Sequence, residues 1–269
     1  MFASSTISGK TCKAFSKFLL NAQRCKPIKR TCSNRRQAIV AMSSAVQQGR
    51  FPEPVVKRAG KEHKATVFML HGLGDTGHGW ADVASMWGAS LQDVKFVFPT
   101  APTRPITLNM GMAMPGWFDL TSLDKNTWVD DKAGMQESLR YLEGLIEKEI
   151  ENGIPAESIA VAGFSQGGAV ALLMLRSKIA VSGIVGMSTF LPLRHETPLV
   201  SSENAATPVL LCHGDMDQVL AYENGKDSFE LLKGTGVQAD FKTYRGMQHS
   251  ACPEELEEVK QFFTKVLKR

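Results

Sequence analysis

The sequence has 269 residues, of which 43% are hydrophobic, so its length suits a single globular domain with one large core. The formal net charge of +4 is unevenly distributed, because residues 1–52 contain ten Lys and Arg and no acidic residue. The remainder carries 21 basic and 27 acidic residues, a net charge of −6. Nucleic-acid binding requires a basic face on the folded domain, so the composition argues against it.

Residues 1–41 have the composition of an organelle targeting peptide. They are basic, rich in Ser and Thr, free of acidic residues, and contain only short apolar runs such as Phe18–Leu20. A secretory signal needs about 7 to 15 consecutive apolar residues, so import into a chloroplast or a mitochondrion is predicted. The alternatives are a disordered tail, or initiation at Met42, which leaves the protein in the cytoplasm. Residues 42–63 are predicted to be a linker and residues 64–269 the folded domain.

Cysteine usage favours an intracellular protein. Three of the five cysteines lie in the basic segment, so Cys212 and Cys252 alone cannot form a disulfide framework. The cysteines lack the spacing of a metal site, and neither a metal nor a cofactor is predicted. No stretch approaches 18 apolar residues, so any membrane contact is expected to be peripheral. Nothing in the sequence indicates an oligomeric state.

The folded domain alternates short apolar runs with helical periods, which predicts an α/β fold. In chain order, the expected elements are strands Ala65–Leu70 and Lys95–Phe98, helix Asp130–Glu151, strands Ser158–Ala162, Gly183–Gly186, Pro208–Cys212 and Asp240–Tyr244, and a helix from Pro253 to the chain end. Apolar residues at three- and four-residue spacings mark the first helix, and Asn152-Gly153 ends it. This alternation is typical of a mostly parallel central sheet flanked by helices.

The motif Gly163-Phe164-Ser165-Gln166-Gly167 lies between a predicted strand and a helical run. In that context, flanking glycines permit a strained turn that projects the serine hydroxyl above the sheet, and the helix N-terminus favours developing negative charge. Ser165 is therefore the predicted nucleophile. The competing interpretation is a glycine-rich turn with an incidental serine.

A serine nucleophile needs a base, and in this type of fold the acid and the histidine follow the serine along the chain. Of six histidines, only His249 follows the last predicted strand and precedes the last helix. The others are interpreted as surface or turn-stabilising residues. Two acids, Asp215 and Asp217, follow the strand Pro208–Cys212, at the sheet edge where ligand-binding loops lie. Order and placement alone leave both as candidates.

Several motifs in register resemble the acyl-protein thioesterase and lysophospholipase family of small carboxylesterases. They are His71 to Gly77, Pro105 to Leu120, Gly163 to Gly168, Leu191 to Leu193, His213 to Asp217 and Gly246 to Ser250. The resemblance implies an α/β-hydrolase fold, Asp217 as the triad acid, and backbone amides of Leu73 and Gln166 as the oxyanion hole. Family members usually carry proline after this acid, whereas this chain has Gln218, so a looser loop is expected here.

The intervals from Ser165 to Asp217 and from Asp217 to His249 are 52 and 32 residues, which leaves little room for a large lid domain. The resemblance implies hydrolysis of acyl thioesters or esters, with S-palmitoylated proteins or lysophospholipids as substrates. Alternatives are a broad carboxylesterase acting on small esters and a non-catalytic ligand receptor. Candidate acyl-pocket residues are Leu73, Met110, Met112, Trp117 and Phe190, for which core packing is the competing interpretation.

Overall fold

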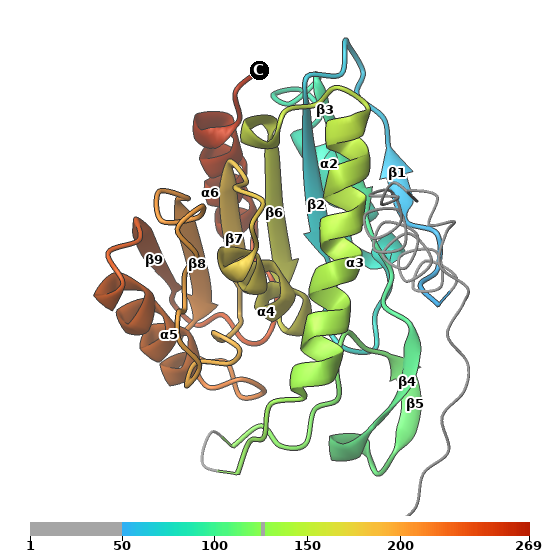
Figure 1. The fold of residues 1–269 in the computed structure, drawn as a ribbon. Coiled ribbons are helices and arrows are strands. Elements are labelled where there is room, and N and C mark those ends of the chain that lie inside the picture. Colours follow the sequence, from blue (N-terminus) through green and yellow to red (C-terminus); the bar gives the residue numbers. More distant parts are fainter. Residues whose placement is uncertain (1–49, 125–126) are drawn as a thin grey trace, which may run out of the picture. The chain divides into compact units, whose positions relative to one another are not determined.

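The computed structural model describes residues 50–124 and 127–269, so the predicted targeting peptide, residues 1–41, lies outside the described residues. The described chain forms a seven-stranded sheet in the order β1-β3-β2-β6-β7-β8-β9 (Figure 1). Strand β1 (Val55–Lys57) pairs antiparallel with β3, and every other pair is parallel. The strands are β2 (Ala65–Leu70), β3 (Val94–Phe98), β6 (Ile159–Phe164), β7 (Gly183–Met187), β8 (Val209–Gly214) and β9 (Ala239–Tyr244).

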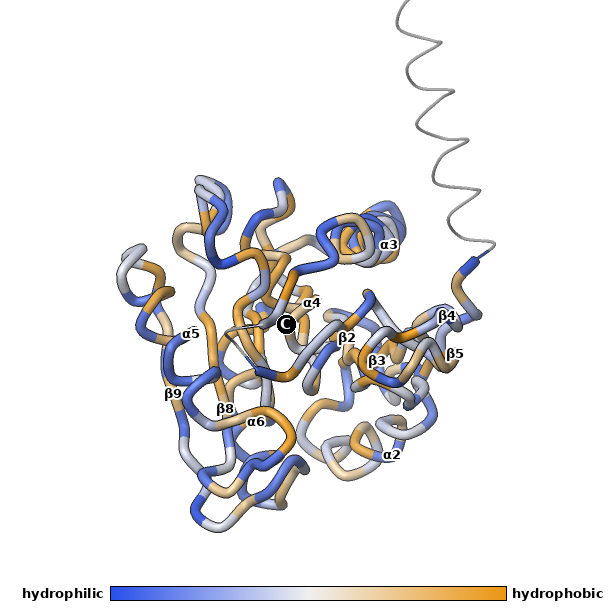
Figure 2. Tube along the Cα trace, turned by 90° about the horizontal axis from the view of Figure 1, so that it is seen from below, coloured by the Kyte–Doolittle hydropathy of each residue, from blue (hydrophilic) through white to orange (hydrophobic). Residues whose placement is uncertain are grey.

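Helices cover both faces of the sheet, as the view along the strands in Figure 2 shows. One face carries α3 (Lys132–Glu151), α4 (Gln166–Leu173) and α5 (Tyr222–Gly234), and the other carries α2 (Gly77–Trp87) and α6 (Pro253–Val266). Short 3-10 turns lie at Thr107–Asn109, Ala156–Ser158 and Met174–Arg176. The predicted α/β-hydrolase architecture is confirmed, and the described residues contain no large lid domain.

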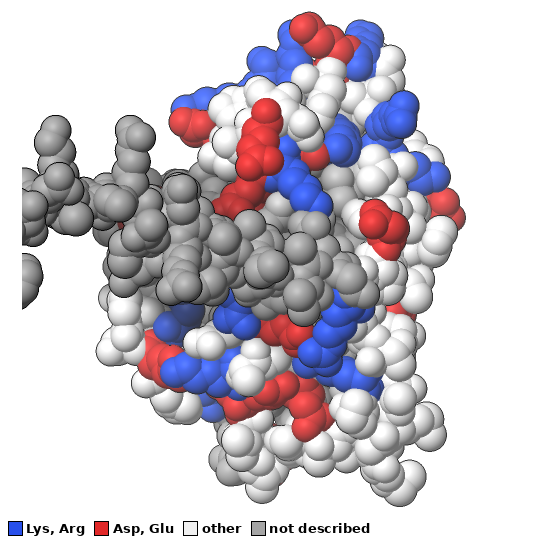
Figure 3. Space-filling model, turned by 45° about the vertical axis from the view of Figure 1, so that its right-hand side comes forward, with Lys and Arg blue, Asp and Glu red and all other residues white. Residues whose placement is uncertain are grey.

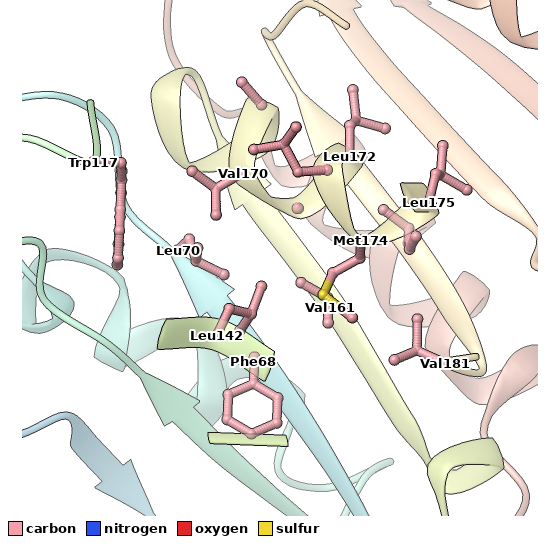
Figure 4. Packing of buried hydrophobic residues seen from close by; sticks show 14 of the residues in the cluster. Phe68, Leu70, Trp117, Leu142, Val161, Val170, Leu172, Met174, Leu175 and Val181 are labelled. Carbon is pink, nitrogen blue, oxygen red and sulfur yellow. The ribbon is translucent and has the colours of Figure 1, made fainter. Parts of the chain in front are cut away.

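The two faces of β2 explain why the core has two halves. All six residues of this strand are buried, as expected for a central parallel strand covered on both sides. Phe68 and Leu70 point to the α3 and α4 side, where Figure 4 shows them beside Leu142, Val161 and Val170. Val67 and Met69 point to the α2 and α6 side. The alternation of side chains along the strand therefore divides one apolar run between two cores.

Three kinds of element were absent from the sequence-based expectation. Helices α2 and α5 each contain two glycines, which lower the intrinsic helix propensity of these segments, and neither helix was predicted. Strands β4 (Thr103–Ile106) and β5 (Met112–Pro115) form a separate two-stranded antiparallel hairpin. Strand β1 lies within the expected linker, residues 42–63, and is only three residues long, too short for an alternation to be recognised.

Charged side chains of both signs are interspersed on the face shown in Figure 3. Arg104 of β4, which is nearly buried, pairs with Glu137 of α3 at 3.0 Å, and Arg50 pairs with the same carboxylate at 2.7 Å. These ion pairs join the hairpin and the start of the described chain to α3. Among the described residues, no helix is long and apolar enough to cross a membrane.

Candidate active site

Ser165 sits at a strained turn between β6 and α4. Its φ of 52° and ψ of −120° lie in a region that residues with a side chain rarely adopt. A Cβ added at Gly163 would lie 2.2 Å from the Gly167 carbonyl oxygen, and one at Gly167 would lie 2.4 Å from the His71 carbonyl oxygen. The flanking glycines thus permit a contact between strand and helix that a larger residue would prevent, and this tight turn lifts Ser165 above the sheet edge.

The structure brings the three predicted triad residues together. The Nε2 atom of His249 lies 3.0 Å from Ser165 Oγ, and its Nδ1 atom lies 2.7 Å from Asp217 Oδ2. His249 follows β9 and Asp217 follows β8, so each side chain comes from a loop at the carboxyl edge of the sheet. The Asp217 side chain is fully buried, whereas His249 retains 15% exposure toward the cavity described below.

The carboxylate of Asp217 is held in its charged form by hydrogen bonds. Burial by itself raises the pKa of Asp217, but hydrogen bonds from His213, His249 and the Leu220 amide outweigh burial and bring the pKa well below its ordinary value. The Oδ1 atom accepts the backbone N–H groups of Val219 and Leu220, both at 2.9 Å. Asp217 is therefore an anion at neutral pH, available to accept the Nδ1–H of His249.

Asp215, the other candidate acid, occupies a different position. Its side chain is exposed, and its Oδ1 accepts the backbone N–H of Gly246 at 2.6 Å. This bond ties the loop after β8 to the loop that carries His249. Asp215 is thus placed to support the geometry of the two loops rather than to contact the imidazole.

The backbone amides of Gln166, which follows Ser165, and of Leu73, in the loop after β2, have no hydrogen-bond acceptor among the described residues. Gln166 is the first residue of α4, where amides lack partners within the helix. The loop after β2 reaches Ser165 closely, since a Cβ added at Gly72 would lie 3.4 Å from the Ser165 Cβ. A concave site with two free N–H groups beside a hydroxyl is suited to binding an oxyanion.

Hydrogen bonds fix the chain around these amides. The buried Gln166 side chain accepts the Trp117 amide and donates to the Phe118 carbonyl, both at 2.7 Å. His71 Nε2 accepts the Ala101 amide at 3.0 Å, so its hydrogen resides on Nδ1, which donates to Gly72 O at 2.7 Å. Burial lowers the pKa of His71, which keeps this imidazole neutral. The loop is therefore preorganised.

A cavity of about 540 Å³ opens over Ser165 and His249, a size in the range of small-molecule sites. Most of its lining is apolar, with Leu73, Trp80, Leu108, Leu120, Leu123, Trp128, Phe164, Phe190, Val219, Leu220 and Ala251. Of the predicted acyl-pocket residues, Leu73 and Phe190 are part of this lining.

The other predicted pocket residues lie elsewhere. Trp117 is fully buried, and its Nε1 donates to the His71 carbonyl at 2.9 Å, so it belongs to the core beneath the loop rather than to the cavity. Met110 and Met112 are 95% and 62% exposed on the β4–β5 hairpin, outside the cavity lining. Their placement follows from the hairpin, which the sequence pattern did not reveal. Within residues 50–124 and 127–269, no three His, Cys, Asp or Glu side chains cluster as a metal site.

Residues 52–267 match the phospholipase/carboxylesterase family. The chain belongs to this family. It is 45% identical over 224 residues to acyl-protein thioesterase 1 of Gibberella zeae, covering 80% of this chain and 95% of that protein. The corresponding enzyme of Cryptococcus neoformans is 44% identical over 225 residues, covering 77% and 94%.

Solved structures of plant proteins show the same fold. Arabidopsis thaliana SOBER1 superposes with a TM-score of 0.73 at 30% identity, over 76% of this chain and all of that one. Zea mays acyl-protein thioesterase 2 gives a TM-score of 0.71 at 32% identity, over 80% and 99%. As a member of the phospholipase/carboxylesterase family, the protein is a hydrolase, and the predicted resemblance is confirmed.

Several residues of the candidate site were not predicted from the sequence. Trp80 lines the cavity from α2 and Val219 lines it from the loop two residues after Asp217, but neither is a polar or titratable residue that would mark it as part of a site. His213, interpreted as a turn residue, is 1% exposed and lies 3.3 Å from Asp217 through its Nε2 atom. The four-residue spacing of His213 and Asp217 was visible in the sequence, but only the bend of the loop brings the two side chains together.

Proposed function

We propose that this hydrolase cleaves acyl thioesters, and more slowly oxygen esters, with Ser165 as nucleophile, His249 as general base and Asp217 as the acid that orients the histidine. The observation that carries the proposal is the continuous relay from Ser165 Oγ through both nitrogens of His249 to Asp217, with distances of 3.0 and 2.7 Å, beneath an apolar cavity. A serine activated in this way attacks carbonyl carbon and forms a covalent intermediate.

In the first half of the reaction, Ser165 Oγ forms a bond to the carbonyl carbon while His249 Nε2 takes the hydroxyl proton. The carbonyl oxygen becomes an oxyanion, to which the amides of Leu73 and Gln166 donate, and each such donor typically lowers the barrier by about 3 kcal/mol. Asp217 stabilises the imidazolium. Collapse of the intermediate breaks the bond to the leaving group, which departs with the proton of His249.

The second half restores the enzyme. Water loses a proton to His249 Nε2 and its oxygen attacks the acyl carbon, so that the bond to Ser165 Oγ breaks and the serine recovers its proton from the imidazolium. The products are a carboxylic acid and the free thiol or alcohol. No residue beyond the triad and the two amides needs to change its bonding.

The chemistry of the leaving group favours thioesters. A thiol has a pKa near 8.5, so its bond to carbon can break before His249 has fully transferred the proton, whereas an alkoxide depends on proton donation as its bond breaks. The apolar lining favours a long acyl chain, because each buried methylene contributes up to about 0.8 kcal/mol. S-acylated proteins are the proposed substrates, since the relatives at 44–45% identity are named acyl-protein thioesterases. Lysophospholipids are the competing substrate class.

The test compares kcat/KM for matched thioesters and oxygen esters with acyl chains from C2 to C16, and for an S-palmitoylated peptide against a lysophospholipid. We expect thioesters to exceed esters and longer chains to exceed shorter ones. Ser165→Ala is the control, and it should abolish both turnover and labelling by a fluorophosphonate probe without unfolding the chain. A preference for acetyl esters would instead indicate a general carboxylesterase, and full activity of Ser165→Ala would refute the mechanism.

We also infer that residues 1–41 direct the protein to an organelle. This inference rests on composition alone, since these residues lie outside the described part of the chain. A basic, hydroxyl-rich and acid-free segment is typical of chloroplast and mitochondrial import. Membrane contact during catalysis is proposed to be at most peripheral.

A further inference from the structure

Asp217 Oδ2 faces two imidazoles rather than one. His249 Nδ1 lies 2.7 Å from this oxygen, and His213 Nε2 lies 3.3 Å from it. The second histidine is the penultimate residue of β8 and is 1% exposed, so it reaches the carboxylate from inside the protein. Its Nε2 atom also lies 2.9 Å from the carbonyl oxygen of Leu220.

The surroundings of His213 determine which nitrogen carries its hydrogen. Nε2 faces two acceptors, the Asp217 carboxylate and the Leu220 carbonyl, whereas the buried Nδ1 has no hydrogen-bond partner among the described residues. Nδ1 points at α5, where a Cβ added at Gly225 would lie 2.3 Å from it. A hydrogen on Nδ1 would therefore be a buried, unpaired donor, so the neutral Nε2–H tautomer is the form that fits this site.

We propose that His213 is a positioning residue of the catalytic relay: it donates Nε2–H to Asp217 and to Leu220 O, and so fixes the loop and turns the carboxylate toward His249. This inference rests on the proposed function, in which Asp217 orients His249. Without His213, the Oδ2 atom keeps only His249 as its hydrogen-bond donor among the described residues.

In this chain, a hydrogen bond from His213 holds the loop that follows β8. Asp217 to Leu220 turns back on itself, with Asp217 Oδ1 accepting the amides of Val219 and Leu220. Gln218 is exposed at the tip and supplies no rigid φ there, unlike a proline. The bond from His213 to Leu220 O closes the turn from the sheet side, so both ends of the loop are tied to β8.

The positioning role predicts a change in pH dependence that a purely structural role does not. A donor removed from Asp217 makes its carboxylate more basic, so the carboxylate stabilises the protonated form of His249 more strongly. The acidic limb of the kcat/KM profile then moves to higher pH. Three groups face His213: Asp217 in the loop that follows β8, and Tyr222 and Gly225 of α5. The centroid of the Tyr222 ring lies 6.0 Å from that of the imidazole, and its hydroxyl pairs with Thr243 of β9. Only Asp217 among them is charged at neutral pH.

The experiment compares His213→Met with His213→Gln, because the two side chains have similar volumes and only glutamine carries an N–H donor. We expect His213→Met to lower kcat about tenfold with little change in KM, and to raise the acidic limb by roughly half a pH unit, since hydrogen bonds to charged groups are stronger than neutral ones. His213→Gln should restore much of both. The exposed His195, changed to Met, controls for the loss of a histidine.

Nitrogen NMR of the unmodified enzyme supplies a test that does not depend on folding of a variant, and it should report the Nε2–H tautomer for His213. The Nδ1–H tautomer would overturn the inference, as would wild-type kinetics in His213→Met, or a loss of kcat with an unmoved acidic limb. Ser165→Ala measured in parallel separates the two proposals: if it is inactive while His213→Met is unaffected, only the role of His213 fails.

Discussion

Replacing Asp217 with asparagine tests the relay, because the structure fixes how an amide must sit there. The Oδ1 position accepts the backbone N–H groups of Val219 and Leu220, so the asparagine oxygen must occupy it. The amide NH2 then takes the Oδ2 position and faces His249 Nδ1 at 2.7 Å. It donates to that nitrogen, which leaves the imidazole hydrogen on Nε2, opposite Ser165 Oγ. In this tautomer His249 cannot accept the serine proton.

The size of the effect follows from what is needed to restore the correct tautomer. Rotating the amide would place its NH2 against the two backbone N–H groups and leave them unsatisfied, at about 1–3 kcal/mol each. A penalty on the order of 4 kcal/mol corresponds to a loss of about 10³-fold in kcat/KM. Asp215→Asn is the matched control, since an asparagine oxygen still accepts the Gly246 amide, and it should change kcat/KM by less than about threefold.

The assay is kcat/KM on a long-chain thioester for both variants, with circular dichroism and thermal unfolding to show that each is folded. The reasoning fails if Asp217→Asn keeps more than a tenth of the activity. It also fails if Asp215→Asn is the more damaged of the two, which would transfer the role of the acid to Asp215.

Three further predictions concern other parts of the chain. Burial raises the pKa of Glu255, on α6, from 4.5 to about 8, against the opposing Cys252 amide. As the pH rises, the unfolded chain loses the Glu255 proton near pH 4.5, whereas the folded chain keeps it until about pH 8. The free energy of unfolding is therefore highest below pH 4.5 and falls toward pH 8 by up to about 1.4 kcal/mol per pH unit. Glu255→Gln should therefore gain stability relative to wild type from pH 5 to 8 in urea titrations, and parallel curves would contradict this. Gly163→Ala should lower the free energy of unfolding by about 3 kcal/mol and abolish activity, because the added Cβ would lie 2.2 Å from the Gly167 carbonyl oxygen. Gly144→Ala is the control: it has open space around the added Cβ and should stabilise α3. Equal effects of the two substitutions would refute the steric argument. Residues 1–41 fused to a fluorescent reporter should carry it into a chloroplast or mitochondrion, and a diffuse cytosolic signal would favour initiation at Met42.

The sequence by itself determined the features that depend on local order along the chain. The predicted strand Ala65–Leu70 has the same bounds as β2, because a central parallel strand is a continuous apolar run flanked by polar residues. The helix expected over Asp130–Glu151 forms from Lys132, after an Asp131 N-cap whose side chain accepts the Gly134 amide. The glycines around Ser165 and the order of residues along the chain identified Ser165 and His249, whereas the choice of Asp217 over Asp215 came from the family resemblance.

Only the tertiary structure decided which side chains come into contact where loops meet at the edge of the sheet. Order along the chain left Asp215 and Asp217 as alternatives, since a two-residue difference in a loop changes which carboxylate turns inward. Trp117 was interpreted as a possible pocket residue, yet the Gln166 side chain holds its backbone so that the indole enters the core. His213 gains its contact with Asp217 through the bend between Gly214 and Leu220. Periodicity reports which residues are buried, but a contact between side chains of separate loops depends on backbone geometry that no spacing in the sequence encodes.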